Sequence, residues 1–211
     1  EVRLSVLVTL ADIAAGKLAG RSTEPRICQT LDLDLHLVDQ PTGPGFGLGE
    51  LVRCRSRIVR LGRNIVMTGF ELFSSAGSSP FGFGHAGFMA SANPEHVQPD
   101  GGFPLVDEGE RGGLDRPLAE RVGSWRLDDG AVVPLRVENV NATGALQGGL
   151  LALAVEESVF ATAPRARLAS IELRYLRAFR DESASARATI AGDIARVEIE
   201  PGSRSPNELL P

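Results

Sequence analysis

The stretch 141–164 constrains the fold of this chain more than any other. A helix is predicted over 148–163, because a glycine-bearing turn precedes it and Pro164 stops it. Its residues are apolar or small on every side except around the acidic pair Glu156 and Glu157. A helix that is apolar all round is a buried helix, and at about 24 Å this one is too short and too acidic to span a membrane. Because a buried carboxylate is unfavourable unless it is paired or used, the acids mark a candidate functional helix.

A second helix of the same character is predicted near the start of the chain. Residues 3–19 are apolar almost throughout, with Asp12 in the middle. Strands are predicted after it at 27–38, 50–61, 65–73 and 81–90, from alternating or strand-like apolar runs. The alternation slips at Val59, as a β-bulge requires, and residues 61–64 read as a hairpin turn. A helix followed by hairpin-connected strands predicts an antiparallel sheet with one face closed by the helix.

The same order recurs in the second half of the chain. Residues 95–115 are rich in Pro, Gly and acids and are predicted to be a linker. Further elements are predicted as a short helix at 116–122 and strands at 131–138, 168–178 and 186–199. The alternation of apolar residues slips again within 186–199, as it does at Val59. Two copies of one α+β unit, at 1–94 and 116–211, account for this pattern. The first copy has no strand before its helix and the second has no closing hairpin, so either the ends are missing or the neighbouring copy completes each sheet.

Composition excludes several classes of function. The 211 residues carry a formal net charge of −5, which argues against nucleic acid as a partner. No signal peptide or transmembrane run is present, and the two cysteines form no CxxC motif, so a cytoplasmic protein with no membrane association is expected. The three histidines lie on separate segments without ligand spacing, so no metal site is predicted.

The pattern Asn-x-x-Gly-x-x-Gly-Gly before a core helix with an acid resembles the motif of hotdog-fold thioesterases of the PaaI-like group. In that group the motif runs Asn, Gly, His-Gly-Gly, and then an acid nine positions after the His. It falls here on Asn141, Gly144, Gln147, Gly148, Gly149 and Glu156, with Gln147 in the place of the family's His. In the first copy Asp12 matches the helix acid, and residues 3–5 stand in the place of His-Gly-Gly. The resemblance covers both copies and implies a double hotdog, in which two antiparallel sheets each wrap a central apolar helix.

Thioester hydrolysis needs a polarised carbonyl and a carboxylate that attacks or activates water. Gly148 and Gly149 begin a helix, where amide N–H groups and the helix dipole favour negative charge and form an oxyanion hole. Gly148 and Glu156 are eight residues apart, about 12 Å along one helix, so they do not serve the same carbonyl. The acid for this site must then come from the other core helix, and Asp12 is the obvious supplier.

An antiparallel pairing of the two core helices would make one complete site and one degenerate site. The complete site combines Asp12 with Asn141, Gln147, Gly148 and Gly149; Asn141 would donate a hydrogen bond or orient water. The degenerate site pairs Glu156 with residues 3–5. Simpler interpretations stay open: Asp12 and Glu156 as structural acids paired with arginine, and the glycine pair as a close-packing device. Glu157, turned about 100° from Glu156, is expected to face solvent or a partner.

Arg60 and Arg63 flank the predicted bulge and hairpin, and are expected either to contact the phosphates of coenzyme A or to stay solvated. The leading prediction is an acyl-CoA or acyl-carrier-protein thioesterase. It would need no cofactor beyond the coenzyme A of its substrate and would form a homodimer of double hotdogs. The alternative is a non-catalytic acyl-CoA- or lipid-binding hotdog protein. A hydratase is disfavoured, because it would need a His paired with an acid and neither core helix contains a His.

Overall fold

The computed structural model describes residues 3–38, 51–75, 77–98 and 116–202. The chain divides into two compact units, which are described separately. The first unit comprises Glu1–Arg3, Leu10–Asp115 and Ala169–Leu176, and the second comprises Leu4–Thr9, Arg116–Leu168 and Arg177–Pro211. Each unit contains an antiparallel sheet and a helical segment, so the predicted α+β class is confirmed.

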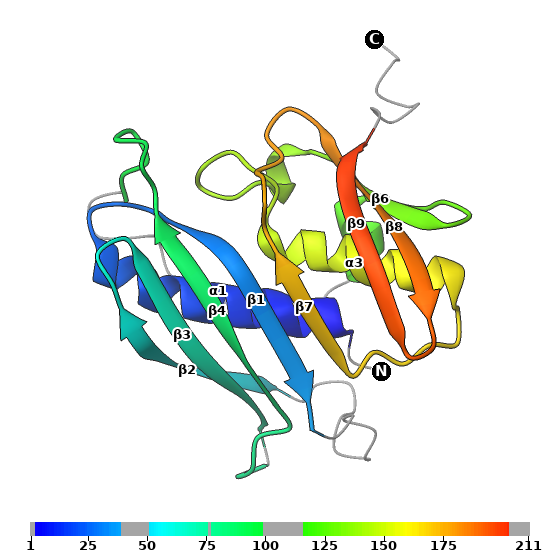
Figure 1. Cartoon of the computed structure of the whole chain (residues 1–211), viewed down its shortest axis with the longest axis horizontal. Coiled ribbons are helices and arrows are strands. Elements are labelled where there is room, and N and C mark those ends of the chain that lie inside the picture. The colour runs from blue at the N-terminus through cyan, green and yellow to red at the C-terminus, as the bar shows by residue number, and fades with distance from the viewer. Residues whose placement is uncertain (1–2, 39–50, 76, 99–115, 203–211) are drawn as a thin grey trace. The chain divides into compact units, whose positions relative to one another are not determined.

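The first unit holds a five-stranded antiparallel sheet in the order β2-β3-β4-β1-β7. Its strands are β1 (Cys28–Leu37), β2 (Val52–Leu61), β3 (Ile65–Ser74), β4 (Gly82–Ala90) and β7 (Ser170–Arg174). The part of helix α1 (Leu4–Thr23) that belongs to this unit, from Leu10 onward, crosses one face of this sheet (Figure 1). The buried residues of α1 recur at Ala11, Ala15 and Ala19, and this small-residue stripe brings the helix close to the strands.

The core of the first unit lies between α1 and the inner face of the sheet. Its largest fully buried side chains in the sheet are Leu33, Leu35, Val66, Leu72 and Phe88. Along β1 the buried leucines alternate with Asp32, Asp34 and His36, as the sequence pattern predicts for a half-buried strand.

The second unit holds a four-stranded antiparallel sheet in the order β5-β6-β8-β9. Its strands are β5 (Trp125–Arg126), β6 (Gly130–Val133), β8 (Ser183–Ala191) and β9 (Ile194–Gly202). The helical elements are α2 (Leu118–Val122), the 3-10 turn η1 (Val137–Asn139) and α3 (Gly148–Thr162). Helix α3 packs on β6 and β8, and ten of its residues are buried, so the prediction of a buried apolar helix is confirmed.

Three predicted strands differ from the structure. The strand predicted at 168–178 in the second copy is the shorter β7, which pairs with β1 in the sheet of the first unit. The strand predicted at 131–138 ends at Val133, because Pro134 has no N–H to continue the ladder. The single strand predicted at 186–199 is the hairpin β8–β9, in which Gly192 and Asp193 connect Ala191 to Ile194. Gly192 has φ +60°, and no residue other than glycine has positive φ in the described chain, so this is a II′-type hairpin turn. The slip in alternation there marks a turn rather than a bulge.

The other strand features agree with the sequence. The register of β2 against β3 shifts between Ile58 and Arg60, which confirms the bulge at Val59. The hairpin turn after Leu61 is also present. Among the helices of the described residues, none is long and apolar enough to cross a membrane.

Candidate active site

Asp12 lies in the middle of α1, where 9% of the residue is exposed. The Thr30 hydroxyl on β1 donates a hydrogen bond to Asp12 Oδ1 at 2.8 Å. Burial raises the pKa of Asp12 from 3.8 to about 6, and the hydrogen bond from Thr30 offsets only part of that effect. Asp12 is therefore a carboxylate that takes and releases a proton close to neutral pH, as a general base requires.

A β-bulge turns Thr30 toward Asp12. The register of β1 against β4 jumps from the pair Thr30–Phe88 to the pair Asp32–Gly87, which leaves Leu31 as the extra residue. In a regular strand Thr30 and Asp32 would share a face. The bulge instead places Thr30 opposite the core residue Phe88, on the helix side of the sheet. No sequence pattern had indicated this residue.

Tyr175 lies beside the same position. Its backbone N–H donates to the carbonyl of Leu31, the bulge residue, at 2.8 Å. The pKa of its phenol is raised well above 10, first by burial and then by the charge of Asp12. Tyr175 is therefore a neutral phenol in the electrostatic neighbourhood of Asp12, and the sequence analysis did not single it out.

The loop before α3 is built by Asn141. Its Oδ1 accepts hydrogen bonds from the N–H and hydroxyl of Thr143 and from the N–H of Ala145. Gly144, with φ +74°, supplies the left-handed turn, which confirms a glycine-bearing turn before the helix. Asn141 is exposed, and its carbonyl oxygen shapes the loop. A role for its NH₂ group in catalysis stays a prediction.

Gln147 is the N-cap residue of α3, and its carbonyl accepts the N–H groups of Leu150 and Leu151. Its side chain is half-buried and makes no cap hydrogen bond. Gly148 and Gly149 form the first turn, so their N–H groups are outside the i→i−4 bonding of the helix. An oxyanion hole at this end of α3 stays a prediction.

Gly149 also has a packing role. A Cβ at this position would lie 2.2 Å from Thr9 Oγ1 and 2.8 Å from Thr9 Cα. Real side chains do not approach so closely, so only glycine lets the first part of α1 contact α3 here. The close-packing interpretation therefore holds for Gly149, and it leaves the backbone amide in place.

Glu156 lies against the start of α1 within the second unit. Its carboxylate accepts a hydrogen bond from Leu4 N at 2.8 Å and from Ser5 Oγ at 2.5 Å. Leu4 and Ser5 thus meet Glu156 while Thr9 meets Gly149, so α1 runs antiparallel to α3 over Leu4–Thr9. Glu156 therefore contacts two of the residues 3–5 with which it was predicted to pair, and the degenerate site itself stays a prediction. The carboxylate accepts a hydrogen bond from an N–H group in the first turn of α1, where a negative charge also interacts favourably with the helix dipole.

The expectation for Glu157 is wrong. The residue is 5% exposed rather than solvent-facing, and its carboxylate forms an ion pair with Arg126 Nε at 2.5 Å. Residues 156 and 157 point in different directions from the helix, but α3 is surrounded closely enough that both are buried.

Arg60 and Arg63 are both exposed, Arg60 on β2 just after the bulge and Arg63 in the hairpin turn. Neither makes an ion pair with another described residue. The contact with coenzyme A phosphates stays a prediction.

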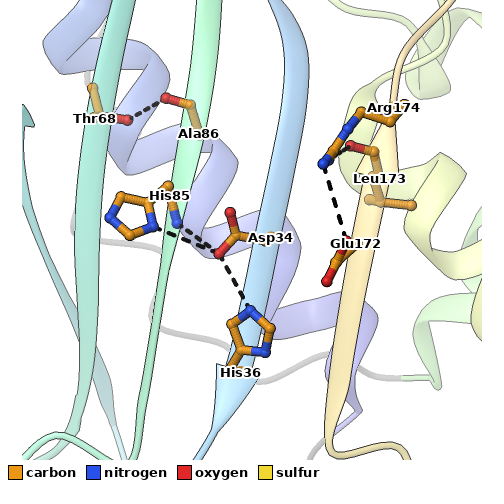
Figure 2. A network of polar contacts seen from close by, with 8 residues as sticks. All are labelled: Asp34, His36, Thr68, His85, Ala86, Glu172, Leu173 and Arg174. Carbon is orange, nitrogen blue, oxygen red and sulfur yellow. Dashed lines mark hydrogen bonds and ion pairs between the residues drawn. The ribbon is translucent and has the colours of Figure 1, made fainter. Parts of the chain in front are cut away.

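The solvent-side face of the first sheet carries a polar cluster that contains none of the predicted site residues. Figure 2 shows Asp34 between His36 and His85, with Glu172 on the neighbouring strand. Asp34 Oδ1 accepts the backbone N–H of His85 at 3.1 Å and lies 3.5 Å from His36 Nε2. These side chains are exposed to solvent at 27% for Asp34, 40% for His36 and 53% for His85. In the described part of the chain, no group of His, Cys, Asp or Glu residues has the arrangement of a metal site.

The structure thus groups the predicted site residues in two sets. Asp12 belongs to the first unit, where Thr30 and Tyr175 join it. The second set belongs to the second unit and consists of Asn141, Gln147, Gly148, Gly149 and Glu156.

No protein-family profile matches the chain, and no curated protein matches it significantly. Solved structures do match it over nearly its whole length. A putative oleoyl thioesterase from Lactobacillus plantarum is 11% identical with a TM-score of 0.63, over 95% of this chain and 84% of that chain. An acyl-ACP thioesterase from Bacteroides thetaiotaomicron is 11% identical with a TM-score of 0.59, over 96% of this chain and 86% of that chain.

The 12:0-ACP thioesterase from Umbellularia californica is 13% identical with a TM-score of 0.54, over 94% of this chain and 87% of that chain. At such low identity the likeness establishes the fold and not the activity. These three structural neighbours are hotdog-fold thioesterases, and the chain shares their fold.

Proposed function

We propose that this protein hydrolyses acyl thioesters, with Asp12 as general base or nucleophile and the first turn of α3 as the oxyanion hole. The observation that carries the proposal is the state of Asp12. Its carboxylate is buried in a helix, is held by Thr30, and has a pKa of about 6. Perturbed carboxylates of this kind concentrate at functional sites.

In the general-base route, ionised Asp12 takes a proton from water as the water oxygen attacks the thioester carbonyl. The carbonyl oxygen becomes an oxyanion, which accepts hydrogen bonds from the amides of Gly148 and Gly149. The C–S bond then breaks, and the proton on Asp12 passes to the leaving thiolate. In the nucleophilic route, the Asp12 carboxylate attacks the carbonyl carbon and the C–S bond breaks, which gives an acyl anhydride and a thiolate. Water then hydrolyses the anhydride to the carboxylic acid and the Asp12 carboxylate, and the proton released protonates the thiolate.

The assignment of Asp12 and the α3 residues to one site is part of this proposal, because the reaction needs a carboxylate and hydrogen-bond donors at the same carbonyl group. The side chain of Gln147 makes no hydrogen bond with another described residue and can therefore donate to the substrate.

We assign the mirror arrangement around Glu156 to a degenerate site within a double hotdog. The Glu156 carboxylate already accepts the N–H of Leu4 and the hydroxyl of Ser5, which is a capping role for α1. A residue with this structural role is poorly suited to take up a proton during turnover.

The substrate class we propose is an acyl thioester of coenzyme A or of an acyl-carrier protein. Two of the structural neighbours are described as thioesterases for acyl-carrier protein substrates. Arg60 and Arg63 are proposed to contact the phosphates, and no cofactor is needed for either chemical route. A cytoplasmic location and assembly into a homodimer remain part of the proposal.

The test is hydrolysis of a panel of acyl-CoA esters, from acetyl to oleoyl and including an aromatic ester, followed by thiol release. The wild type is compared with Asp12→Asn and with the matched control Glu156→Gln. We expect hydrolysis by the wild type, a loss of at least 100-fold in kcat for Asp12→Asn, and retained activity for folded Glu156→Gln. If no ester is hydrolysed but acyl-CoA binds, the alternative of a non-catalytic binding protein is correct. If only Glu156→Gln is inactive, the assignment of the two sites is reversed.

A further inference from the structure

The β-bulge at Leu31 has a consequence for Asp12. Without it, the alternation of β1 would point Thr30 to the same side of the sheet as Asp32, Asp34 and His36. With it, the Thr30 hydroxyl reaches Asp12 Oδ1 at 2.8 Å. Register shifts that re-aim one side chain are typical of strands next to functional sites.

We propose that Thr30 is a positioning residue of the active site, which fixes the Asp12 carboxylate by one oxygen and leaves the other oxygen for water or substrate. The inference rests on the proposed thioester hydrolysis, since it assigns a role at the same site. A hydroxyl that donates to a carboxylate stabilises its ionised form more than its neutral form. Thr30 therefore both orients Asp12 and limits how far burial raises the pKa of its carboxyl group.

The surroundings of Asp12 in the first unit make Thr30 its main polar support. Strand β1 contributes the Thr30 hydroxyl, and the facing position of β4 is the apolar Phe88. The segment after β7 contributes Tyr175, whose phenol is neutral in the pH range of interest because its pKa is raised. Neither Phe88 nor a neutral phenol supplies a compensating positive charge. Loss of the Thr30 hydroxyl should therefore destabilise the ionised form of Asp12.

The experiment compares Thr30→Val, which removes the hydroxyl at nearly constant shape, with Thr30→Ser, which keeps it. The matched control is Thr68→Val. Thr68 also lies in the first sheet and is fully buried, but its hydroxyl donates to the carbonyl of Ala86 (Figure 2). Thr30→Ala serves as a second variant if valine prevents folding. The pKa of Asp12 is measured by ¹³C NMR of labelled aspartate carboxyls, with the Asp12 signal assigned by its absence in Asp12→Asn.

We expect Thr30→Val to raise the pKa of Asp12 by about one unit and to move the acid limb of the kcat/KM profile upward by the same amount. At a pH below that limb, activity falls about tenfold. Thr30→Ser is expected to stay close to the wild type, and Thr68→Val to change neither quantity even if it lowers the melting temperature.

Two outcomes decide between this inference and the proposed function. An unchanged NMR titration and pH profile in a folded Thr30→Val or Thr30→Ala protein would overturn the positioning role. A shifted NMR titration in a protein that hydrolyses no thioester would support the link from Thr30 to Asp12 and overturn the proposed hydrolysis instead.

Discussion

Replacement of Asp12 by Asn should stabilise the protein while it abolishes activity. The native pKa of Asp12 is about 6, against 3.8 for the unperturbed group. A carboxyl whose pKa is raised on folding stabilises the native state fully below the unfolded pKa, and this contribution is lost as the pH rises through the native pKa. The ionised carboxylate of the active form is therefore a source of instability above about pH 6.

The magnitude follows from the shift of about two pKa units. At about 1.4 kcal/mol per unit, wild type loses about 3 kcal/mol of unfolding free energy between pH 3 and pH 8 through this group, most of it above pH 4. Asparagine has the shape of aspartic acid, stays neutral, and keeps a carbonyl oxygen that accepts the hydroxyl of Thr30. Asp12→Asn should thus match wild type near pH 4 and exceed it by about 3 kcal/mol at pH 8, which is roughly 6–12 °C in melting temperature.

Urea denaturation at pH 4, 5, 6, 7 and 8 measures this difference by linear extrapolation. The control is Asp193→Asn, in the exposed turn of the β8–β9 hairpin, which should give a small difference that is constant with pH. Lower stability of Asp12→Asn at pH 8, or a pH-independent difference from wild type, would refute the reasoning. It would mean that the Asp12 carboxylate is held in its ionised form by a partner.

Three further substitutions test the packing around the two helices. Gly149→Ala should lower the unfolding free energy by at least about 2 kcal/mol, because its Cβ would lie 2.2 Å from Thr9 of α1. The control Gly16→Ala should leave the unfolding free energy unchanged or raise it, because its Cβ would lie at an ordinary 3.4 Å from Phe88. Equal effects of the two substitutions would contradict this prediction. Glu156→Gln should lower the unfolding free energy by about 2–4 kcal/mol, because it weakens two buried hydrogen bonds to a carboxylate. Urea titrations at constant pH measure this change. Unchanged stability with lost activity would show a catalytic role for Glu156 instead. Arg126→Met should lower the unfolding free energy by about 1–3 kcal/mol, because the buried Glu157 carboxylate loses its ion pair with Arg126. Addition of Glu157→Gln to the same chain should restore most of this stability. Thermal melts of the single and double variants measure both effects.

Much of the secondary structure could be predicted from the sequence, because it depends on the local periodicity of apolar residues. The buried helix that ends before Pro164, the half-buried strand 28–37 and the bulge at Val59 each follow from the spacing of apolar residues. The hairpin at Gly192 was missed, because a glycine and an aspartate within a run of alternating residues were read as a slip in one strand. A two-residue Gly-Asp loop between strand-like runs was the signal that identifies it.

Part of the candidate site was also accessible, namely those residues whose type is unusual for their position. Acids in apolar helices single out Asp12 and Glu156, and a glycine pair at a helix start singles out the first turn of α3. The burial of Glu157 could not be predicted from the sequence. A residue turned by 100° from a buried neighbour is exposed only if that side of the helix faces solvent. Here its pairing with Arg126 depends on a strand more than thirty residues earlier.

The sequence by itself determined that two apolar helices carry acids and that strands follow each of them, since local propensity and periodicity decide those features. The tertiary structure alone decided what each acid contacts. Glu156 meets the start of α1 across 152 residues of chain, and Thr30 reaches Asp12 only because one extra residue in β1 reverses the side to which it points. Hydrogen-bond partners so distant in sequence, and side-chain directions set by a one-residue register shift, arise from the pairing of strands and helices and leave no periodic trace in the chain.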